Sequence, residues 1–161
     1  MSLPVSLRSA RLLVVDDVRE ILPLFASAAA RCRTARFDVV ATADPREALR
    51  LAGAEAFDVV IADYRMPCAD GLDVLAAARR RNPEGLRVLA SGFREATLPA
   101  TRMEAARPHR FLEKPIERGE LAIFLERLLA ESPPWAPAPR EPPRGRYFPA
   151  TMRRTSPSTI S

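Results

Sequence analysis

The sequence predicts an α/β domain built on a doubly wound, five-stranded parallel sheet. Short apolar runs alternate along the chain with helical patterns, and each of the five runs is followed by one helical segment. Runs that are apolar throughout are typical of strands buried on both faces, and strand–helix alternation is typical of a parallel sheet covered on both sides. Two of the runs also end in acidic residues, and the carboxyl ends of parallel strands are where reactive groups gather.

The first strand is expected at residues 11–17, RLLVVDD, which ends in Asp16 and Asp17. The helix that follows contains Pro23 about one turn inside it. Because proline has no backbone N–H to donate, we expect this helix to be kinked.

The second strand is expected at residues 37–43, FDVVATA. Asp44 then has the position of a helix N-cap, with Pro45 at the first helical position and Glu47 three residues after the cap. This arrangement predicts a capping box. Gly53 is expected to end the helix.

The third strand is expected at residues 57–63, FDVVIAD, and ends in Asp63. Asp70 is expected to cap the next helix, and the pair Asn82-Pro83 to end it. Three apolar positions of this helix should share one face: Leu72, Leu75 and Ala76.

The fourth strand is expected at residues 86–92, LRVLASG, and a short helix at about 98–106. The stretch RFLEKP (110–115) supplies the fifth strand. The last helix is indicated by apolar residues at helical spacing, namely Leu121, Phe124, Leu125, Leu128 and Leu129.

Composition divides the chain into three parts. Residues 1–9 are an N-terminal extension, 10–131 form the domain, and 132–161 are a tail holding 8 of the 16 prolines and five arginines against one glutamate. Such a composition predicts a flexible, disordered segment. The tail carries +4 of the net charge of +5, so the domain is close to neutral and a uniformly basic nucleic-acid-binding domain is not indicated.

The remaining composition excludes several classes of site. Two cysteines, Cys32 and Cys68, are too few for a disulfide framework, and with His109 as the single histidine the chain cannot build a His-rich metal site by itself. We expect no signal peptide and no membrane span, and therefore a cytoplasmic location.

Five polar residues follow or end the predicted strands: Asp16, Asp17, Asp63, Ser91 and Lys114. In a doubly wound sheet these positions are neighbours. Three carboxylates in one pocket repel one another unless a cation lies among them, and hard oxygen ligands suit Mg²⁺. Lys114 is the only lysine beside 24 arginines. Its ammonium is a point charge that can reach into a tight site, where the planar guanidinium would be too wide.

The chain resembles the receiver domain of two-component response regulators. The resemblance covers about residues 10–131. It is carried by four motifs in order, VVDD (14–17), IADYRMPCADGLDVL (61–75), LASG (89–92) and FLEKP (111–115). It implies a flavodoxin-like fold with strand order 2-1-3-4-5.

The resemblance also implies roles for the acidic residues. Asp63 matches the phosphoacceptor, which takes a phosphoryl group from a phosphohistidine. Asp17 matches a direct Mg²⁺ ligand and Asp16 one that acts mainly through water. The backbone carbonyl of Arg65 matches a third protein ligand of the ion.

Three further residues match positions around the phosphoryl group. Ser91 and Lys114 match the pair that grips its oxygens, and family members often have a cis bond where this chain has Lys114-Pro115. Phe111 matches an aromatic switch residue that turns inward on activation. A core phenylalanine is the alternative reading of Phe111.

The implied function is a phosphorylation-activated signalling switch. The donor would be a histidine kinase or phosphotransfer protein, and a downstream protein would bind the face of helix four, strand five and helix five. No DNA-binding domain fits in the last 30 residues. No turnover of an external substrate is expected beyond slow self-dephosphorylation.

Two alternatives stay open. A phosphatase of the haloacid dehalogenase type also uses an aspartyl nucleophile, but it needs a second acid where this chain has Arg65. A receiver fold that no longer switches could instead act through the aromatic residues of its tail, Trp135, Tyr147 and Phe148.

Other residues near the motifs have simpler interpretations. His109 is expected at the surface before the fifth strand, and Cys68 is expected to be a bystander thiol near the site. Arg65 and Phe93 are expected to line the mouth of the pocket.

Overall fold

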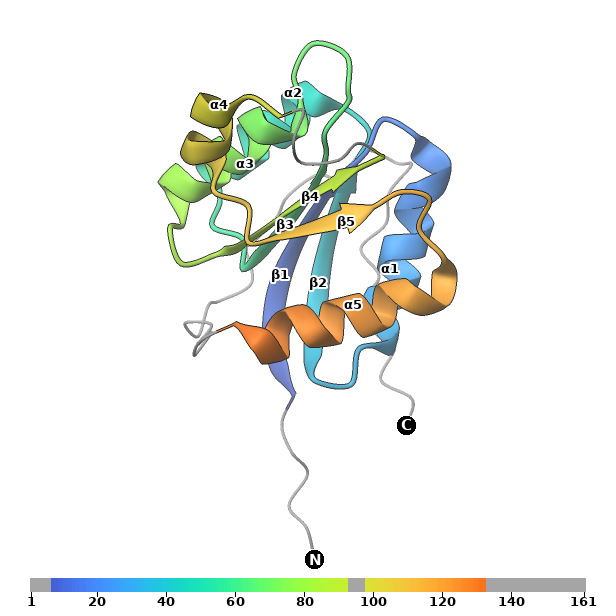
Figure 1. Ribbon diagram of the computed structural model, residues 1–161. Coiled ribbons are helices and arrows are strands. Elements are labelled where there is room, and N and C mark those ends of the chain that lie inside the picture. The colour runs from blue at the N-terminus through green and yellow to red at the C-terminus, as the bar shows by residue number, and fades with distance from the viewer. Residues whose placement is uncertain (1–6, 93–97, 133–161) are drawn as a thin grey trace, which may run out of the picture.

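A parallel five-stranded sheet forms the centre of the computed structural model, which describes residues 7–92 and 98–132 (Figure 1). The strand order is β2-β1-β3-β4-β5, and every neighbouring pair is parallel. This confirms the predicted fold class and strand order. The strands are β1 (Arg8–Val15), β2 (Ala35–Thr42), β3 (Val59–Asp63), β4 (Leu86–Ser91) and β5 (Arg110–Glu113).

Helices cover both faces of the sheet (Figure 1). A 3₁₀ turn (Arg19–Ile21) leads into α1, which lies with α5 on one face, and α2, α3 and α4 cover the other. The helices are α1 (Leu22–Arg31), α2 (Pro45–Ala54), α3 (Gly71–Arg81), α4 (Ala100–Ala106) and α5 (Arg118–Glu131).

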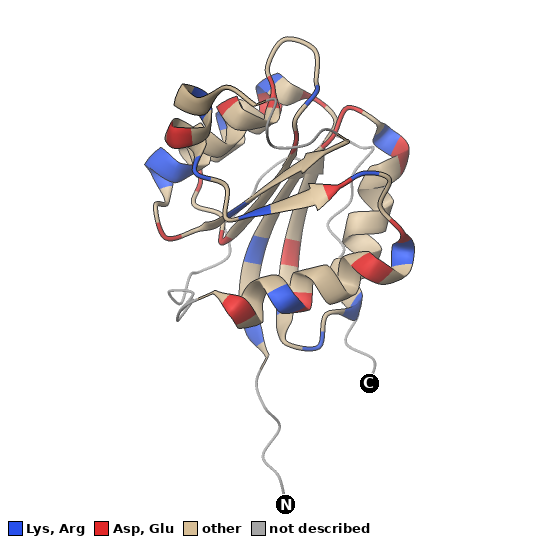
Figure 2. Ribbon diagram, viewed as in Figure 1, with Lys and Arg blue, Asp and Glu red and all other residues tan. Residues whose placement is uncertain are grey.

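Alternate residues of the strands build two separate cores. Leu12 and Val14 of β1 pack with the cluster under α1 and α5, while Leu13 and Val15 pack with the cluster under α2 and α3. All four are buried, as expected for a strand with helices on both faces. The charged residues lie mainly on helices and near strand ends (Figure 2).

The prediction of a kink at Pro23 is wrong. The α-helix begins at Leu22, so Pro23 occupies one of the first two helical positions, where a backbone N–H has no partner within the helix. The 3₁₀ turn before it carries the chain from β1 into the helix.

The N-cap of α2 is as predicted, but the second hydrogen bond of the predicted capping box, from the Asp44 N–H to Glu47, is replaced by other contacts. The Asp44 side chain accepts a hydrogen bond from the backbone N–H of Arg46. The Asp44 N–H donates to Thr42 Oγ1, and the Glu47 carboxylate is held by Arg50 instead. The helix also continues past Gly53 to Ala54.

The other element boundaries differ from the expected ones by a few residues. β1 begins at Arg8, inside the predicted extension, and ends at Val15, so Asp16 and Asp17 follow the strand. Ala76 is only partly buried, while Leu72 and Leu75 are fully buried. The predictions for residues 1–6, for Phe93 and for the tail from residue 133 lie outside the described residues. In the parts that the structure describes, no helix is long and apolar enough to span a bilayer.

Candidate functional site

Three carboxylates lie together at the carboxyl ends of β1 and β3. Val15 of β1 pairs with Ala62 of β3, so Asp16 and Asp63, each one residue further along, come side by side. Oxygen atoms of Asp16, Asp17 and Asp63 all lie within 4.8 Å of one another. Asp16 and Asp63 are buried, whereas Asp17 is exposed.

Lys114 also belongs to this cluster, although it comes from the edge strand of the sheet. It follows β5, and its Nζ lies 2.6 Å from Asp16 Oδ2 and 2.9 Å from Asp63 Oδ1. Its backbone N–H donates to the carbonyl of Ser91, which ties the residue to the end of β4. The Lys114-Pro115 bond is cis, as the resemblance implied.

Both oxygens of Asp16 have hydrogen-bond donors. Oδ1 accepts from the backbone N–H of Val18, and Oδ2 accepts from Lys114 Nζ. The side chain is 1% exposed, so these bonds replace the water that the carboxylate loses on folding.

The environment of the site raises the pKa of both Asp63 and Lys114. Burial raises the pKa of the Asp63 carboxyl, and the charges of Asp16 and Asp17 add to this effect, while the hydrogen bond from Lys114 opposes it. Burial lowers the pKa of Lys114, but its hydrogen bonds to Asp16 and Asp63 outweigh this and raise it overall. The ammonium therefore stays charged, while ionised Asp63 lies in an unfavourable environment.

Ser91 and Phe111 lie at the expected edge of the sheet. Asp63 pairs with Ala90, so Ser91 is one residue beyond Asp63 on the neighbouring strand, and it is 8% exposed. Phe111 of β5 is half-buried and packs against the core under α2 and α3. Its environment fits both interpretations of Phe111, an aromatic switch residue and a core phenylalanine.

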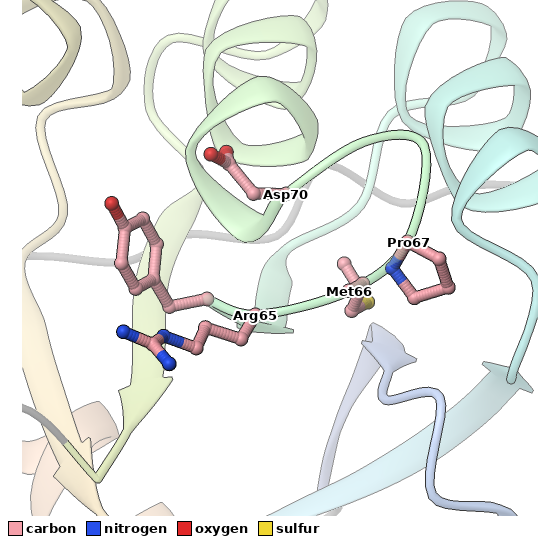
Figure 3. Close-up of a pocket in the computed structure, with 5 residues that line it drawn as sticks. Arg65, Met66, Pro67 and Asp70 are labelled. Atoms are coloured by element: carbon pink, nitrogen blue, oxygen red, sulfur yellow. The ribbon is translucent and has the colours of Figure 1, made fainter.

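The loop after β3 forms an open pocket of about 460 Å³ (Figure 3). Arg65, Met66 and Pro67 lie along this loop, and Asp70 lies beyond them at the start of α3. Arg65 lines this pocket and is exposed. Cys68 of the same loop is exposed, and Arg46 lies 3.8 Å from its Sγ.

His109 lies at the surface just before β5, as predicted. Its Nδ1 accepts a hydrogen bond from the backbone N–H of Arg87. Partial desolvation of the imidazole lowers the pKa of His109, and the neighbouring charges of Arg87 and Arg110 act in the same direction.

Sequence reasoning missed one set of ion pairs beside the site. Asp70 caps α3 in a capping box with Asp73, and the guanidinium of Arg102 on α4 binds both carboxylates. The cap was predictable because an aspartate precedes an apolar helical pattern. Arg102 is one of 24 arginines, and nothing in its sequence context marks it as the partner.

Gly71 brings the start of α3 into contact with the backbone of Asp63. A Cβ atom at Gly71 would overlap the carbonyl oxygen of Asp63 and would lie 2.9 Å from Leu89 Cδ1. The Gly71 N–H also donates to the carbonyl of Tyr64. Position 71 therefore requires glycine for the close approach of helix and strand.

Gly71→Ala should lower the free energy of unfolding by roughly 1.5 kcal/mol, because backbone atoms would have to move to admit the methyl group. The matched control is Gly53→Ala in α2, where an added Cβ meets nothing within 4 Å. Alanine there should be neutral or stabilising by about 0.5 kcal/mol or more. Urea unfolding followed by circular dichroism measures both; equal effects of the two substitutions would contradict the close approach.

The fold and the site together define the class of receiver-like α/β domains. In this class a 2-1-3-4-5 parallel sheet carries a carboxylate–lysine cluster at its carboxyl edge. The model of the response regulator receiver domain matches residues 12–126. The chain belongs to this family, whose members are signalling domains of two-component systems.

Relatives and similar structures agree with this assignment. The response regulator protein PilR of Pseudomonas aeruginosa is 28% identical over 141 residues, covering 76% of this chain and 30% of PilR. The chemotaxis response regulator CheY4 of Vibrio cholerae is 28% identical with a TM-score of 0.61, over 75% of this chain and 99% of that one.

A CheY-like receiver domain protein of Methanospirillum hungatei has a TM-score of 0.63 at 22% identity, over 79% of this chain and 97% of that one, and shows the fold alone. The chain spans between 27% and 30% of the length of the curated relatives that it matches.

Proposed function

We propose that this domain is a phosphorylation-activated switch and that Asp63 accepts the phosphoryl group. The observation that carries the proposal is the position of Lys114, whose ammonium contacts the buried carboxylates of both Asp16 and Asp63. This group of residues is suited to phosphoryl transfer, because it combines a buried aspartate with a fixed ammonium and two further acids.

The acidic cluster fits a bound Mg²⁺. Three carboxylate oxygens within 4.8 Å of one another are the hard ligands that this ion prefers. Asp17 and Asp63 would hold it directly, together with the backbone carbonyl of Arg65. Asp16 would act mainly through water, because both of its oxygens already accept hydrogen bonds from the protein. When bound, the ion neutralises charge on the transferring phosphoryl oxygens.

The donor in this proposal is a histidine kinase or a phosphotransfer protein. A carboxylate oxygen of Asp63 attacks the phosphorus of a phosphohistidine, the P–N bond breaks, and the imidazole leaves and takes up a proton. The product is an aspartyl phosphate. Lys114 and the hydroxyl of Ser91 then hold its oxygens, since both residues lie at the same edge of the sheet as Asp63.

The signal would leave through protein contacts at the face of α4, β5 and α5, with Phe111 of β5 as the aromatic switch residue. One relative is named as the DNA-binding transcriptional regulator NtrC of Azospirillum brasilense, and the chain matches 27% of its length. We propose a cytoplasmic location for this domain and no turnover of an external substrate.

Incubation with acetyl phosphate and Mg²⁺ tests the proposal. Intact-protein mass spectrometry should detect the mass of one added phosphoryl group on the wild type and none on Asp63→Asn. Asp44→Asn is the matched control, because Asp44 follows β2 at the same edge of the sheet and asparagine is an equally good N-cap. An unmodified wild type, or modification of Asp63→Asn to the same extent, would refute the proposal.

A further inference from the structure

The single histidine of the chain lies where α4 is joined to β5 (Figure 1). We call residues 106–110, from the last residue of α4 to the first residue of β5, the α4–β5 corner. His109 is exposed, so its imidazole can exchange a proton with water. The candidate site does not use this histidine, because Lys114, which contacts the acidic cluster, follows the opposite end of β5.

His109 is bound to β4 by two reciprocal hydrogen bonds. Its backbone N–H donates to the Arg87 carbonyl at 2.7 Å, and its Nδ1 accepts from the Arg87 N–H at 3.0 Å. A backbone N–H can only donate, so Nδ1 carries no proton and the imidazole proton is on Nε2. These bonds come directly before the β4–β5 ladder, whose first pair is Val88 with Arg110. Neutral His109 therefore extends the attachment of β5 to β4 by one residue.

The corner also contains a residue with an unfavourable backbone conformation. Arg107 has φ 42° and ψ 65°, in the left-handed region that residues other than glycine seldom adopt. The buried side chain of Arg87 supports this conformation, because its Nε donates to the carbonyls of Ala106 and Arg107 at 2.9 and 3.2 Å. Arg87 thus holds the corner in two ways, through its guanidinium and through its backbone bonds to His109.

The charged groups around the imidazole disfavour a further positive charge. Arg87 and Arg110 act on His109 directly, and Arg110 Nη1 donates to the carbonyl of His109 at 2.8 Å. Three further groups act on the Arg87 guanidinium, namely Arg79 of α3, Arg107 and Glu84. Two acids of this region bind arginines instead, Glu104 to Arg107 and Glu131 of α5 to Arg110. An imidazolium at this position would therefore face two guanidinium groups.

We propose that the α4–β5 corner is an acid-sensitive contact that opens when His109 takes up a proton from water. A proton on Nδ1 would place two N–H donors against each other, so the bond from the Arg87 N–H breaks. This N–H belongs to a buried residue, and leaving it without its acceptor costs free energy. The opening is confined to the corner, because at the other end of β5 the Lys114 N–H donates to the Ser91 carbonyl.

The direction of the pH effect follows from the two states of the corner. In the closed corner the pKa of His109 is lowered, whereas in the open corner the imidazole titrates as an ordinary histidine, with a pKa of about 6.5. The contribution of the contact to stability is therefore fully present above the ordinary pKa. It is lost as the pH falls through that value toward the lower pKa of the closed corner.

Nuclear magnetic resonance of the full chain tests the proposal. Because the chain has one histidine, every imidazole signal belongs to His109. At neutral pH the ring should be the tautomer with its proton on Nε2, and its titration midpoint should lie below the ordinary pKa of about 6.5. The amide signals of Arg87 and His109 should titrate with the same midpoint. The other tautomer, or a midpoint at or above the ordinary pKa, would overturn the proposal.

Two substitutions separate the hydrogen bond from the titration. His109→Asn offers a side-chain oxygen that can accept from the Arg87 N–H but does not titrate, and His109→Leu offers no acceptor. Amide exchange at Arg87 and at residue 109, corrected for the intrinsic effect of pH, should become roughly tenfold faster in the wild type between about pH 8 and about pH 5. It should stay slow in His109→Asn and be fast at both pH values in His109→Leu. The amide of Leu125 in α5 should not respond in any of the three proteins.

The remaining outcomes also decide the proposal. An acid effect of the same size in His109→Asn would assign the opening to another group and overturn the role of His109. Equal corrected exchange rates of the wild-type amides at both pH values would overturn the opening itself. The measurements need neither Mg²⁺ nor a phosphodonor, so a failure of the proposed function would leave their result unaffected.

Discussion

Asp63→Asn should make the free protein more stable at neutral pH, by about 2 kcal/mol, while it loses the phosphoacceptor. Burial raises the pKa of Asp63, and Asp16 and Asp17 repel its charge. The ionised carboxylate therefore costs folding free energy at neutral pH. Asparagine has the same shape without the charge, and its amide oxygen can still accept a hydrogen bond from Lys114.

The effect should depend on pH in a defined direction. The folded-state pKa of Asp63 lies above that of an ordinary aspartyl group, so the folded protein holds this proton more tightly than the unfolded chain. The contribution of Asp63 to stability is therefore present in acid and is lost as the pH rises through the raised pKa. The advantage of Asp63→Asn should shrink toward zero below the ordinary aspartyl pKa.

Urea unfolding at a series of pH values, with and without Mg²⁺, measures this effect. Mg²⁺ should stabilise the wild type more than the variant, because it supplies the opposite charge that the cluster lacks. Asp44→Asn, at an exposed N-cap, should change stability little at any pH. A variant less stable than the wild type at pH 7, or a gain independent of pH, would contradict the account of Asp63.

Most of the candidate site could be predicted because it follows from topology. Asp16, Asp63 and Lys114 are far apart in the sequence, but each comes at the carboxyl end of a strand. In a parallel sheet these ends lie at one edge. An apolar run followed by a polar residue is therefore enough to place that polar residue at the site. The motifs and their order then restricted the family.

Contacts between side chains of neighbouring helices could not be predicted in the same way. Arg102 reaches Asp70 and Asp73 across 32 and 29 residues. No periodicity in the sequence specifies that the arginine of α4 binds the acids at the start of α3. The same limit applies to Glu47. The predicted capping box paired its carboxylate with the backbone N–H of Asp44, but the carboxylate binds Arg50 instead. Side-chain partners at a surface depend on rotamers and on competing donors, which a pattern of residue types does not contain.

Lys114→Met should destabilise the free protein by about 3 kcal/mol, because it leaves Asp16 and Asp63 buried without their common counter-ion. The two carboxylates are 1% and 6% exposed, and Lys114 Nζ contacts both. Burial already raises the pKa of Asp63, and without Lys114 this carboxyl should take up its proton more readily, so the loss should be largest at neutral pH and smaller in acid. Saturating Mg²⁺ should restore part of the stability, because the ion provides positive charge at the same cluster.

Arg110→Met is the matched control for this loss. Arg110 is a basic residue at the opposite, amino end of β5, and its ion pair with Glu131 is exposed on both sides. Its removal should change the free energy of unfolding by about 0.5 kcal/mol or less. If both variants lose the same stability, Lys114 acts as an ordinary surface cation and the buried cluster does not depend on it.

Lys114→Arg separates charge from shape. An arginine keeps the positive charge, so it should recover most of the stability that Lys114→Met loses. Its planar guanidinium is wider than an ammonium and cannot approach Asp16 Oδ2 and Asp63 Oδ1 from the same point while leaving room for a phosphoryl group. Phosphorylation by acetyl phosphate should therefore fall about tenfold or more although the fold is intact. A fully active Lys114→Arg would mean that positive charge alone is required at this position, and that the single lysine among 24 arginines has no structural reason.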